Sequence, residues 1–343
     1  MIQAPELNIV DFLRESYDCT ILDVRSPAEY AKGHIPGAIN IPLFDDDERA
    51  EIGILYKLSG KEDAVERGLE IVSPKLADLV KSTKAVSPGR RVFVYCWRGG
   101  MRSQSFAWLM NTAGLNAQIL KGGYKKYRNH VASFFETNFN LCILGGPTGS
   151  GKSAILRQMA NEGEQVVDLE LIANHKGSAF GAINESAQHP QQIFEHTLFN
   201  AFNTLDLTRR IWLEDEAMAI GWNKIPYPLW KQMKTAPIIK INVPFDHRVK
   251  RLVIDYATAD HSLLERALFA IKDKLGGQRF IEAIKKLHIG DLASVASIAL
   301  FYYDQAYQFN HEKREFKNIS EVETNTGDEH INCRKVLEYI SRI

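Results

Sequence analysis

Residues 92–105 have the sequence VFVYCWRGGMRSQS, which predicts a strand, a tight loop and a helix in direct succession. The first four residues are apolar or aromatic, as expected of a buried strand, and residues 103–110 continue as a helix. Cys96 lies in the loop, where backbone N–H groups of the loop and of the helix start converge on its sulfur. Because such a site favours an anion, the stretch predicts a cysteine that ionises readily and acts as a nucleophile.

Five residues after Cys96 form the predicted active-site loop: Trp97, Arg98, Gly99, Gly100 and Met101. The paired glycines allow the positive φ angles that turn N–H groups inward. Arg102 follows Cys96 by six residues, a spacing that cysteine phosphatases also use to hold a tetrahedral oxyanion. We therefore predict that Cys96 and Arg102 are catalytic and that the loop accepts a phosphate-like donor. The alternative is a small apolar residue closing a strand, which leaves the glycines and arginines without a role.

The segment before this loop carries a second pattern. Asp23-Val24-Arg25 ends a predicted strand, a helix start follows at Ser26-Pro27, and residues 33–38 have the sequence GHIPGA. Together with the cysteine loop, this order resembles the rhodanese (sulfurtransferase) domain over residues 8–128. The resemblance implies an α/β fold with Cys96 as the active cysteine, braced by Asp23 and Arg25.

A phosphate-binding loop occupies the middle of the chain. Residues 141–145 are apolar and predict a strand, residues 146–153 have the sequence GPTGSGKS, and a helix follows. Backbone N–H groups of such a P-loop cradle a diphosphate, Lys152 neutralises it, and Ser153 can hold Mg²⁺. The predicted phosphate-binding residues are Gly146, Gly149, Gly151, Lys152 and Ser153.

Three carboxylates are predicted near the P-loop, for metal binding or acid–base chemistry. Asp168 lies in a predicted strand over residues 166–170, and Glu214 and Asp215 end a predicted strand over residues 210–216. The alternative is an ordinary charged strand end. A further strand is predicted over residues 238–243, and the chain from Asp246 onward is predicted to be mainly helical. No metal site is certain from these residues.

The length of 343 residues predicts about two domains. We predict a rhodanese-like α/β domain over residues 1–134. A P-loop NTPase-like α/β domain with a helical C-terminal part is predicted over residues 135–343. Lys plus Arg and Asp plus Glu both number 42, so the composition does not indicate a polyanion-binding coat. No apolar run reaches membrane-spanning length, and the four cysteines lack metal or disulfide spacing. These features predict a cytoplasmic protein without a membrane partner.

A basic stretch joins the two predicted domains. Residues 121–128 have the sequence KGGYKKYR, in which Tyr124 and Tyr127 alternate with Lys125, Lys126 and Arg128. Lysines and arginines bind nucleic-acid phosphates, and tyrosines stack on bases. We therefore expect tRNA contacts from Tyr124, Lys125, Lys126 and Arg128, with an ordinary interdomain helix as the alternative.

The order of these motifs over the whole chain resembles bacterial tRNA 2-selenouridine synthase. The resemblance also rests on residues 122–125, 173–178 (ANHKGS) and 214–216 (EDE). In this family an arginine usually follows two residues after the acidic run, where this chain has Met218. No role of that arginine is carried over to this chain.

The resemblance implies a transferase that converts wobble 2-thiouridine in the tRNA anticodon to 2-selenouridine. The route runs through S-geranyl-2-thiouridine made from geranyl diphosphate, with selenium from selenophosphate carried on Cys96. It implies tRNA and a selenophosphate-supplying enzyme as partners, geranyl diphosphate at the P-loop, and Mg²⁺ as an optional ion. Phe180, Phe194 and Trp222 are candidate prenyl contacts, although core packing explains each of them better.

Other readings of the motifs stay open. A rhodanese-type sulfurtransferase with an ATP-gated P-loop domain uses both motifs in another way. A thiosulfate sulfurtransferase leaves the P-loop without a role. A cysteine phosphatase needs a general acid that the sequence does not identify. Turnover with thiosulfate, an aryl phosphate or ATP alone separates these classes.

Overall fold

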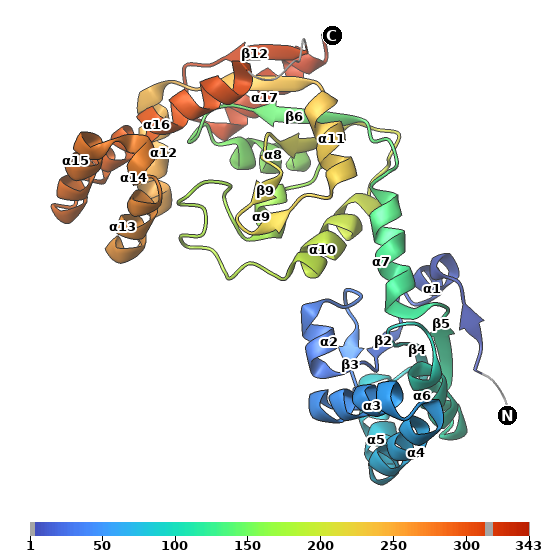
Figure 1. The fold of residues 1–343 in the computed structure, drawn as a ribbon. Coiled ribbons are helices and arrows are strands. Elements are labelled where there is room, and N and C mark those ends of the chain that lie inside the picture. The colour runs from blue at the N-terminus through green and yellow to red at the C-terminus, as the bar shows by residue number, and fades with distance from the viewer. Residues whose placement is uncertain (1–3, 313–317, 343) are drawn as a thin grey trace. The chain divides into compact units, whose positions relative to one another are not determined.

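The computed structural model describes residues 4–312 and 318–342. The chain forms two compact units, Met1–Phe134 and Phe135–Ile343, each with its own sheet (Figure 1). Throughout the described residues, no helix is long and apolar enough to cross a membrane.

The first unit is built on a five-stranded parallel sheet in the order β1-β5-β4-β2-β3. Its strands are β1 (Glu6–Leu7), β2 (Thr20–Asp23), β3 (Ile39–Asn40), β4 (Arg91–Tyr95) and β5 (Asn116–Leu120). Its helices are α1 (Ile9–Glu15), α2 (Pro27–Lys32), α3 (Asp46–Leu58), α4 (Lys61–Val72), η1 (Ser73–Lys75), α5 (Leu76–Val86), α6 (Met101–Thr112) and α7 (Gly123–Phe134). The central strand β4 is the predicted strand before Cys96, and four of its five residues are buried. Burial of this kind is typical of a parallel sheet, because helices cover both of its faces.

Local sequence accounts for the start of α2. The Ser26 side chain accepts a hydrogen bond from the Glu29 N–H, and the Glu29 carboxylate accepts one from the Ser26 N–H. This reciprocal capping box satisfies two N–H groups that the helix itself leaves free, and Pro27 occupies the first helical position. The predicted helix start is therefore confirmed, and it fixes Glu29 near the end of β2.

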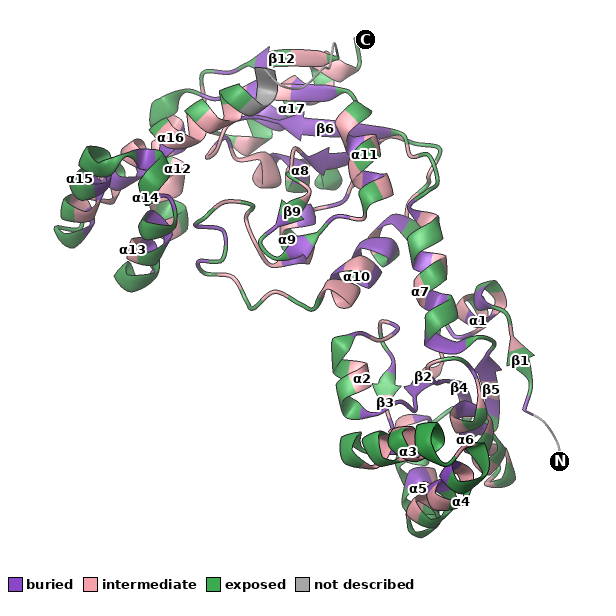
Figure 2. Cartoon of the chain, viewed as in Figure 1, coloured by how far each residue is buried: buried purple, intermediate pink, exposed green. Residues whose placement is uncertain are grey.

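The second unit has a parallel sheet in the order β12-β11-β6-β8-β7. Its strands are β6 (Leu141–Gly145), β7 (Gln165–Val166), β8 (Ile211–Glu214), β11 (Ile238–Asn242) and β12 (Ile319–Glu323), with a small antiparallel pair, β9 (Ala219–Ile220) and β10 (Asn223–Lys224). The helices of the sheet region are α8 (Lys152–Asn161), α9 (Leu169–Ala173), α10 (Gln191–Asn203), α11 (Tyr227–Thr235) and α17 (Glu329–Ile340). The central strand β6 is buried along its whole length and leads directly into the P-loop (Figure 2).

The helical part between β11 and β12 has a core of its own. It comprises α12 (Phe245–Tyr256), α13 (His261–Ala270), α14 (Lys272–Leu275), α15 (Gly277–His288) and α16 (Leu292–Glu312). Its buried side chains include Leu264, Leu268, Phe280, Leu287 and Ala299, and Phe180 joins them from a distant part of the chain. The prediction of a mainly helical region is confirmed here.

Two predicted elements of the second unit differ from the structure. The strand over residues 166–170 ends at Val166, because the Asp168 carboxylate accepts a hydrogen bond from the Leu171 N–H at 2.8 Å and caps α9. Glu170 therefore lies in the first turn of a helix. Strand β12 was not predicted at all. Three of its five residues are polar and they do not alternate with the apolar ones, so only pairing with β11 makes this short edge segment a strand.

Candidate functional site

Cys96 follows β4 directly and is 3% exposed. Its Sγ lies 3.2 Å from the Ser103 Oγ. The Ser103 hydroxyl donates to the Gly100 carbonyl at 3.0 Å, which leaves its oxygen to accept the proton of the thiol. If the thiol ionises, the same hydroxyl can turn its proton to the sulfur. Ser103 was missed as a site residue, although it stands in the first turn of the predicted helix after the loop.

The turn between β5 and α7 donates hydrogen bonds to the Cys96 loop and holds it in place. The N–H groups of Tyr124 and Lys125 donate to the carbonyls of Cys96 and Trp97 at 2.8 and 3.0 Å. Gly123 has φ +59°, and a Cβ there would lie 2.3 Å from the Cys96 carbonyl oxygen and 2.5 Å from the Gly99 nitrogen. Only glycine allows the turn to approach the loop so closely.

Replacing Gly123 with alanine should therefore both destabilise the first unit and disturb Cys96. The matched control is Gly114→Ala, because Gly114 also has a positive φ, +84°, but a Cβ added there would have nothing within 4 Å. We expect Gly123→Ala to lower the free energy of unfolding by about 1–3 kcal/mol more than the control. Urea unfolding measures this difference, and peptide mass spectrometry measures the rate at which Cys96 reacts with iodoacetamide. Equal effects of the two substitutions would mean that the close approach does not matter.

Arg102 is paired with a carboxylate of its own unit. Its Nη1 donates to the Glu29 Oε2 at 2.6 Å, and the Arg49 Nε lies 3.7 Å from the same oxygen. Burial alone would raise the pKa of Glu29, but the hydrogen bond and charge of Arg102 outweigh it and the pKa is lowered. Glu29 is thus ionised at neutral pH, and an anion at the loop must compete with it for Arg102. Glu29 was not identified from the sequence.

The remaining loop residues form the rim of the site. Arg98 and Met101 are exposed, Trp97 and Gly100 are partly buried, and Gly99 is buried. Arg98 is the exposed cation of this set, since Arg102 is already paired with Glu29.

A buried ion pair braces this region. Arg25 and Asp23 are 1% and 0% exposed, and the Arg25 Nε donates to both Asp23 carboxylate oxygens at 2.9 and 3.0 Å. The Arg25 Nη2 also donates to the Gly33 carbonyl at 2.7 Å, which ties β2 to the turn after α2. Its guanidinium carbon lies 3.8 Å from the centre of the Tyr124 ring.

The structure corrects one prediction about tRNA contacts. Tyr124 and Tyr127 are 0% and 1% exposed, so the prediction that they stack on bases is wrong. They lie with Val131 on the buried face of α7, at the spacing of one helical stripe. Lys125 and Lys126 are exposed and Arg128 is partly buried. Their contact with tRNA phosphates stays a prediction.

The P-loop follows β6 and runs into α8, as predicted. Gly151 has φ +77° and caps α8 in the left-handed conformation. The Lys152 Nζ donates to the Gly146 carbonyl of the loop itself at 3.2 Å, and Ser153 donates to the Glu170 Oε2 at 2.8 Å. Gly149 packs against Arg248, where an added Cβ would lie 3.1 Å from the Arg248 carbonyl oxygen.

Two arginines of α12, about a hundred residues after the P-loop in the sequence, contact it. The Arg248 Nε donates to the Thr148 carbonyl at 2.8 Å, and its Nη1 pairs with Asp304 at 3.0 Å. The Arg251 guanidinium packs where a Cβ on Gly151 would lie, 2.7 Å away. Sequence reasoning missed both, although they stand three residues apart on the helix that follows β11.

Carboxylates gather beside Lys152 and Ser153. The Glu214 Oε2 accepts from the Leu169 N–H at 3.1 Å. Within the described residues, the Glu214 Oε1 and the Asp168 Oδ2 have no hydrogen-bond partner. Burial raises the pKa of Glu214 well above its ordinary value, and the charges of Asp168 and Glu170 raise it further. Burial also raises the pKa of Glu216 to about 8, with Glu170 adding to the effect and Lys152 opposing it.

These carboxylates include predicted and missed residues. Asp168 was predicted, as was delivery of Glu214, Asp215 and Glu216 by one strand, whereas Glu170 was not predicted. The Asp215 N–H donates to the Leu144 carbonyl of β6 at 3.1 Å. Residues 4–312 and 318–342 contain no group of three or more His, Cys, Asp or Glu side chains arranged to hold a metal ion. A Mg²⁺ ion at a P-loop needs fewer protein ligands, because phosphate oxygens and waters complete its shell. The Ser153–Glu170 pair fits that smaller requirement, as does the Asp168 Oδ2, which accepts no hydrogen bond from the described residues and lies 3.9 Å from the Arg157 Nη1.

Comparison with known proteins matches both units. Residues 9–130 match the model of the rhodanese-like domain, and residues 139–335 match the tRNA 2-selenouridine synthase AAA domain. Three relatives are each described as tRNA 2-selenouridine synthase. One from Cupriavidus necator is 32% identical, over 87% of this chain and 90% of the relative. One from Salmonella arizonae is 34% identical, over 87% of this chain and 91% of the relative. One from Bordetella petrii is 37% identical, over 71% of this chain and 66% of the relative. The predicted fold class, a rhodanese-like domain followed by a P-loop domain, is confirmed.

Proposed function

Since the chain belongs to the tRNA 2-selenouridine synthase family, we propose that it replaces the 2-thio sulfur of the tRNA wobble uridine with selenium. The sulfur is first alkylated with geranyl diphosphate, and selenium from selenophosphate, bound beside Cys96, then displaces it. One observation carries this proposal: a single chain holds a cysteine loop and a P-loop, each with its own anion-binding backbone. A two-step exchange with a diphosphate substrate and a selenophosphate substrate needs both.

The first step uses the second unit. The thiocarbonyl sulfur attacks C1 of the geranyl group, a C–S bond forms, and the C–O bond to the diphosphate breaks. Loss of the uridine N3 proton leaves neutral S-geranyl-2-thiouridine. Lys152 and the P-loop N–H groups neutralise the leaving diphosphate. Ser153 and Glu170 would hold Mg²⁺, which supplies further positive charge when bound.

The second step uses the first unit. Selenium has the same oxidation level in selenophosphate and in 2-selenouridine, so the net exchange needs no oxidant or reductant. Water supplies the oxygen of the new P–O bond as the P–Se bond breaks and phosphate leaves. The released selenium forms the C2–Se bond as the C2–S bond breaks, and the two protons of the water end on uridine N3 and on the departing geranyl thiol. Alkylation makes the sulfur a leaving group, which a thiocarbonyl sulfur is not. Selenophosphate is bound beside the Cys96 Sγ without formation of an S–Se bond, and Ser103 and the loop N–H groups stabilise charge there.

The proposal includes two macromolecular partners. Lys125, Lys126 and Arg128 are proposed to contact the phosphates of the tRNA, because two of them are exposed on α7, whose first N–H groups donate to the Cys96 loop. The enzyme that makes selenophosphate is proposed to supply the donor to the Cys96 loop, and the reaction is proposed to take place in the cytoplasm.

Reconstitution with tRNA from a strain that lacks the protein tests this function. With geranyl diphosphate alone, nucleoside mass spectrometry should show S-geranyl-2-thiouridine. Addition of selenophosphate should convert it to 2-selenouridine. Thiosulfate and ATP offered in their place should give neither product. Rapid turnover of thiosulfate with ATP hydrolysis, and no change in the tRNA, would support the ATP-gated sulfurtransferase instead.

A further inference from the structure

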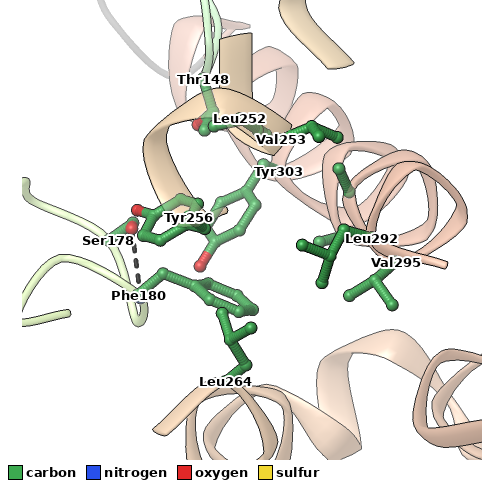
Figure 3. Close-up of a pocket in the computed structure, with 12 residues that line it drawn as sticks. Thr148, Ser178, Phe180, Leu252, Val253, Tyr256, Leu264, Leu292, Val295 and Tyr303 are labelled. Carbon is green, nitrogen blue, oxygen red and sulfur yellow. Dashed lines mark hydrogen bonds between the residues drawn. The ribbon is translucent and has the colours of Figure 1, made fainter. Parts of the chain in front are cut away.

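An apolar cavity opens beside the P-loop within the second unit (Figure 3). The space at and inside its mouth is about 490 Å³ and includes open solvent, while the part that admits the centre of a water-sized sphere is about 40 Å³. Thr148 of the P-loop lines one end, and the rest is lined by residues of α12, α13 and α16 and of the segment between α9 and α10. The twelve lining residues are Thr148, Ser178, Phe180, Leu252, Val253, Tyr256, Leu264, Leu292, Val295, Ala296, Ala299 and Tyr303.

Three of the four hydroxyls on the cavity wall already interact within the protein. The Tyr303 hydroxyl accepts a hydrogen bond from the Ala179 N–H at 3.2 Å, and the Ser178 Oγ accepts one from the Phe180 N–H at 3.2 Å. The Tyr256 hydroxyl interacts with Ser178. Figure 3 shows the rings of Phe180, Tyr256 and Tyr303 gathered at this side of the cavity. The wall therefore offers aromatic and aliphatic carbon to a ligand.

The position of the cavity relates it to the diphosphate site. Thr148 belongs both to the P-loop and to the lining. The turn that carries Ser178 and Phe180 comes shortly after α9, whose Glu170 accepts from Ser153. A ligand whose diphosphate lies in the P-loop thus has the mouth of an apolar cavity beside it.

We propose that this cavity holds the hydrocarbon chain of the prenyl diphosphate, and that its depth selects the chain length. The inference rests on the proposed function, because it assumes that the P-loop binds the diphosphate of a prenyl donor. A purine base would need several hydrogen-bond partners, whereas eight of the twelve lining residues have purely hydrocarbon side chains. A hydrocarbon chain needs none and gains from leaving water.

Of the three aromatic residues considered as prenyl contacts, only one lines the cavity. Phe180 lines it, whereas Phe194 is fully buried elsewhere and is not among the lining residues. Trp222 is 65% exposed, and its Nε1 donates to the His189 carbonyl at 3.4 Å.

Two substitutions should change the chain-length preference in opposite directions. Ala299 is buried on α16, so Ala299→Leu fills part of the cavity, whereas Leu264→Ala on α13 enlarges it. The matched control is Ala293→Leu, at an exposed position on the same helix α16. The full-length proteins are compared with dimethylallyl, geranyl and farnesyl diphosphates as donors to 2-thiouridine tRNA. Nucleoside mass spectrometry gives kcat/KM for each donor.

We expect Ala299→Leu to lower the geranyl-to-dimethylallyl ratio of kcat/KM by about tenfold, the effect of about two buried methylenes. Leu264→Ala should raise the farnesyl-to-geranyl ratio, and the control should change neither ratio. Inhibition by inorganic diphosphate should stay the same in all three variants, because the P-loop is untouched. Circular dichroism verifies that each variant is folded, and Leu264→Ala decides alone if Ala299→Leu does not fold.

Two failures can be told apart. If inorganic diphosphate still inhibits but the ratios stay constant in the folded cavity variants, the cavity is a packing gap and the inference is wrong. If no prenyl diphosphate alkylates the tRNA and inorganic diphosphate does not bind to the unaltered protein, the proposed function itself is wrong.

Discussion

Cys96→Ala should abolish 2-selenouridine while S-geranyl-2-thiouridine accumulates in the tRNA. We propose that the selenium step needs the Cys96 Sγ, whereas the geranyl step uses only the other unit. Nucleoside mass spectrometry of tRNA incubated with geranyl diphosphate and selenophosphate measures both products. The loss of selenation should reach the detection limit, because no other cysteine lies in this loop.

Cys19→Ala is the matched control. Cys19 is a partly buried free cysteine of the same unit, outside the loop. It should leave both products unchanged. If Cys96→Ala returned only unmodified 2-thiouridine with geranyl diphosphate present, the two steps would not be divided between the two sites.

Lys152→Ala should abolish geranylation and still convert tRNA that already carries the geranyl group. The structure places the Lys152 Nζ 3.2 Å from the Gly146 carbonyl, within the loop that we propose receives the diphosphate. Loss of a charge-assisted contact of this kind lowers affinity for the diphosphate about ten- to a hundredfold. The charge also stabilises the diphosphate as it leaves, so the alkylation rate falls further.

The control for charge alone is Lys231→Ala, an exposed lysine on α11. It should change neither the inhibition by inorganic diphosphate nor the geranylation rate. Tight ATP binding by the unaltered protein, rapid ATP hydrolysis and no competition from geranyl diphosphate would contradict the assignment of the P-loop.

The parts of the site that could be predicted are local in sequence. Each of the two loops joins a buried strand to a helix within about fifteen residues, so the periodic pattern and the glycines suffice. The capping of α2 by Ser26 and Glu29 is equally local. Resemblance to known families then supplied the chemistry that these loops alone leave open.

The parts that were missed depend on long-range packing. Glu29 and Arg102 are 73 residues apart, and Thr148 and Arg248 are 100 apart. The spacing of Arg102 from Cys96 predicted an anion site but could not show a competing carboxylate. The cavity forms only because α12 and α16 pack beside a P-loop that precedes them by about a hundred residues or more.

Tyr124 shows why a composition pattern can mislead. Lysines and tyrosines that alternate on a helix fit a nucleic-acid surface, but they fit an amphipathic helix equally well. Here the tyrosines lie on the buried stripe of α7 and the lysines on its exposed side. Tyr124 is buried against Arg25, which shows that the pattern belongs to an amphipathic helix. That contact cannot be read from the sequence.

The central claim is that the two sites perform separate, successive steps on the same uridine. Mixing the two inactive variants tests it most directly. Cys96→Ala and Lys152→Ala proteins are incubated together with tRNA, geranyl diphosphate and selenophosphate, and the wobble nucleosides are measured by mass spectrometry. The account predicts that neither variant alone makes 2-selenouridine and that the mixture does, because one variant supplies the geranylated tRNA that the other converts. A mixture that accumulates S-geranyl-2-thiouridine, and makes no 2-selenouridine although both variants are folded, would contradict it.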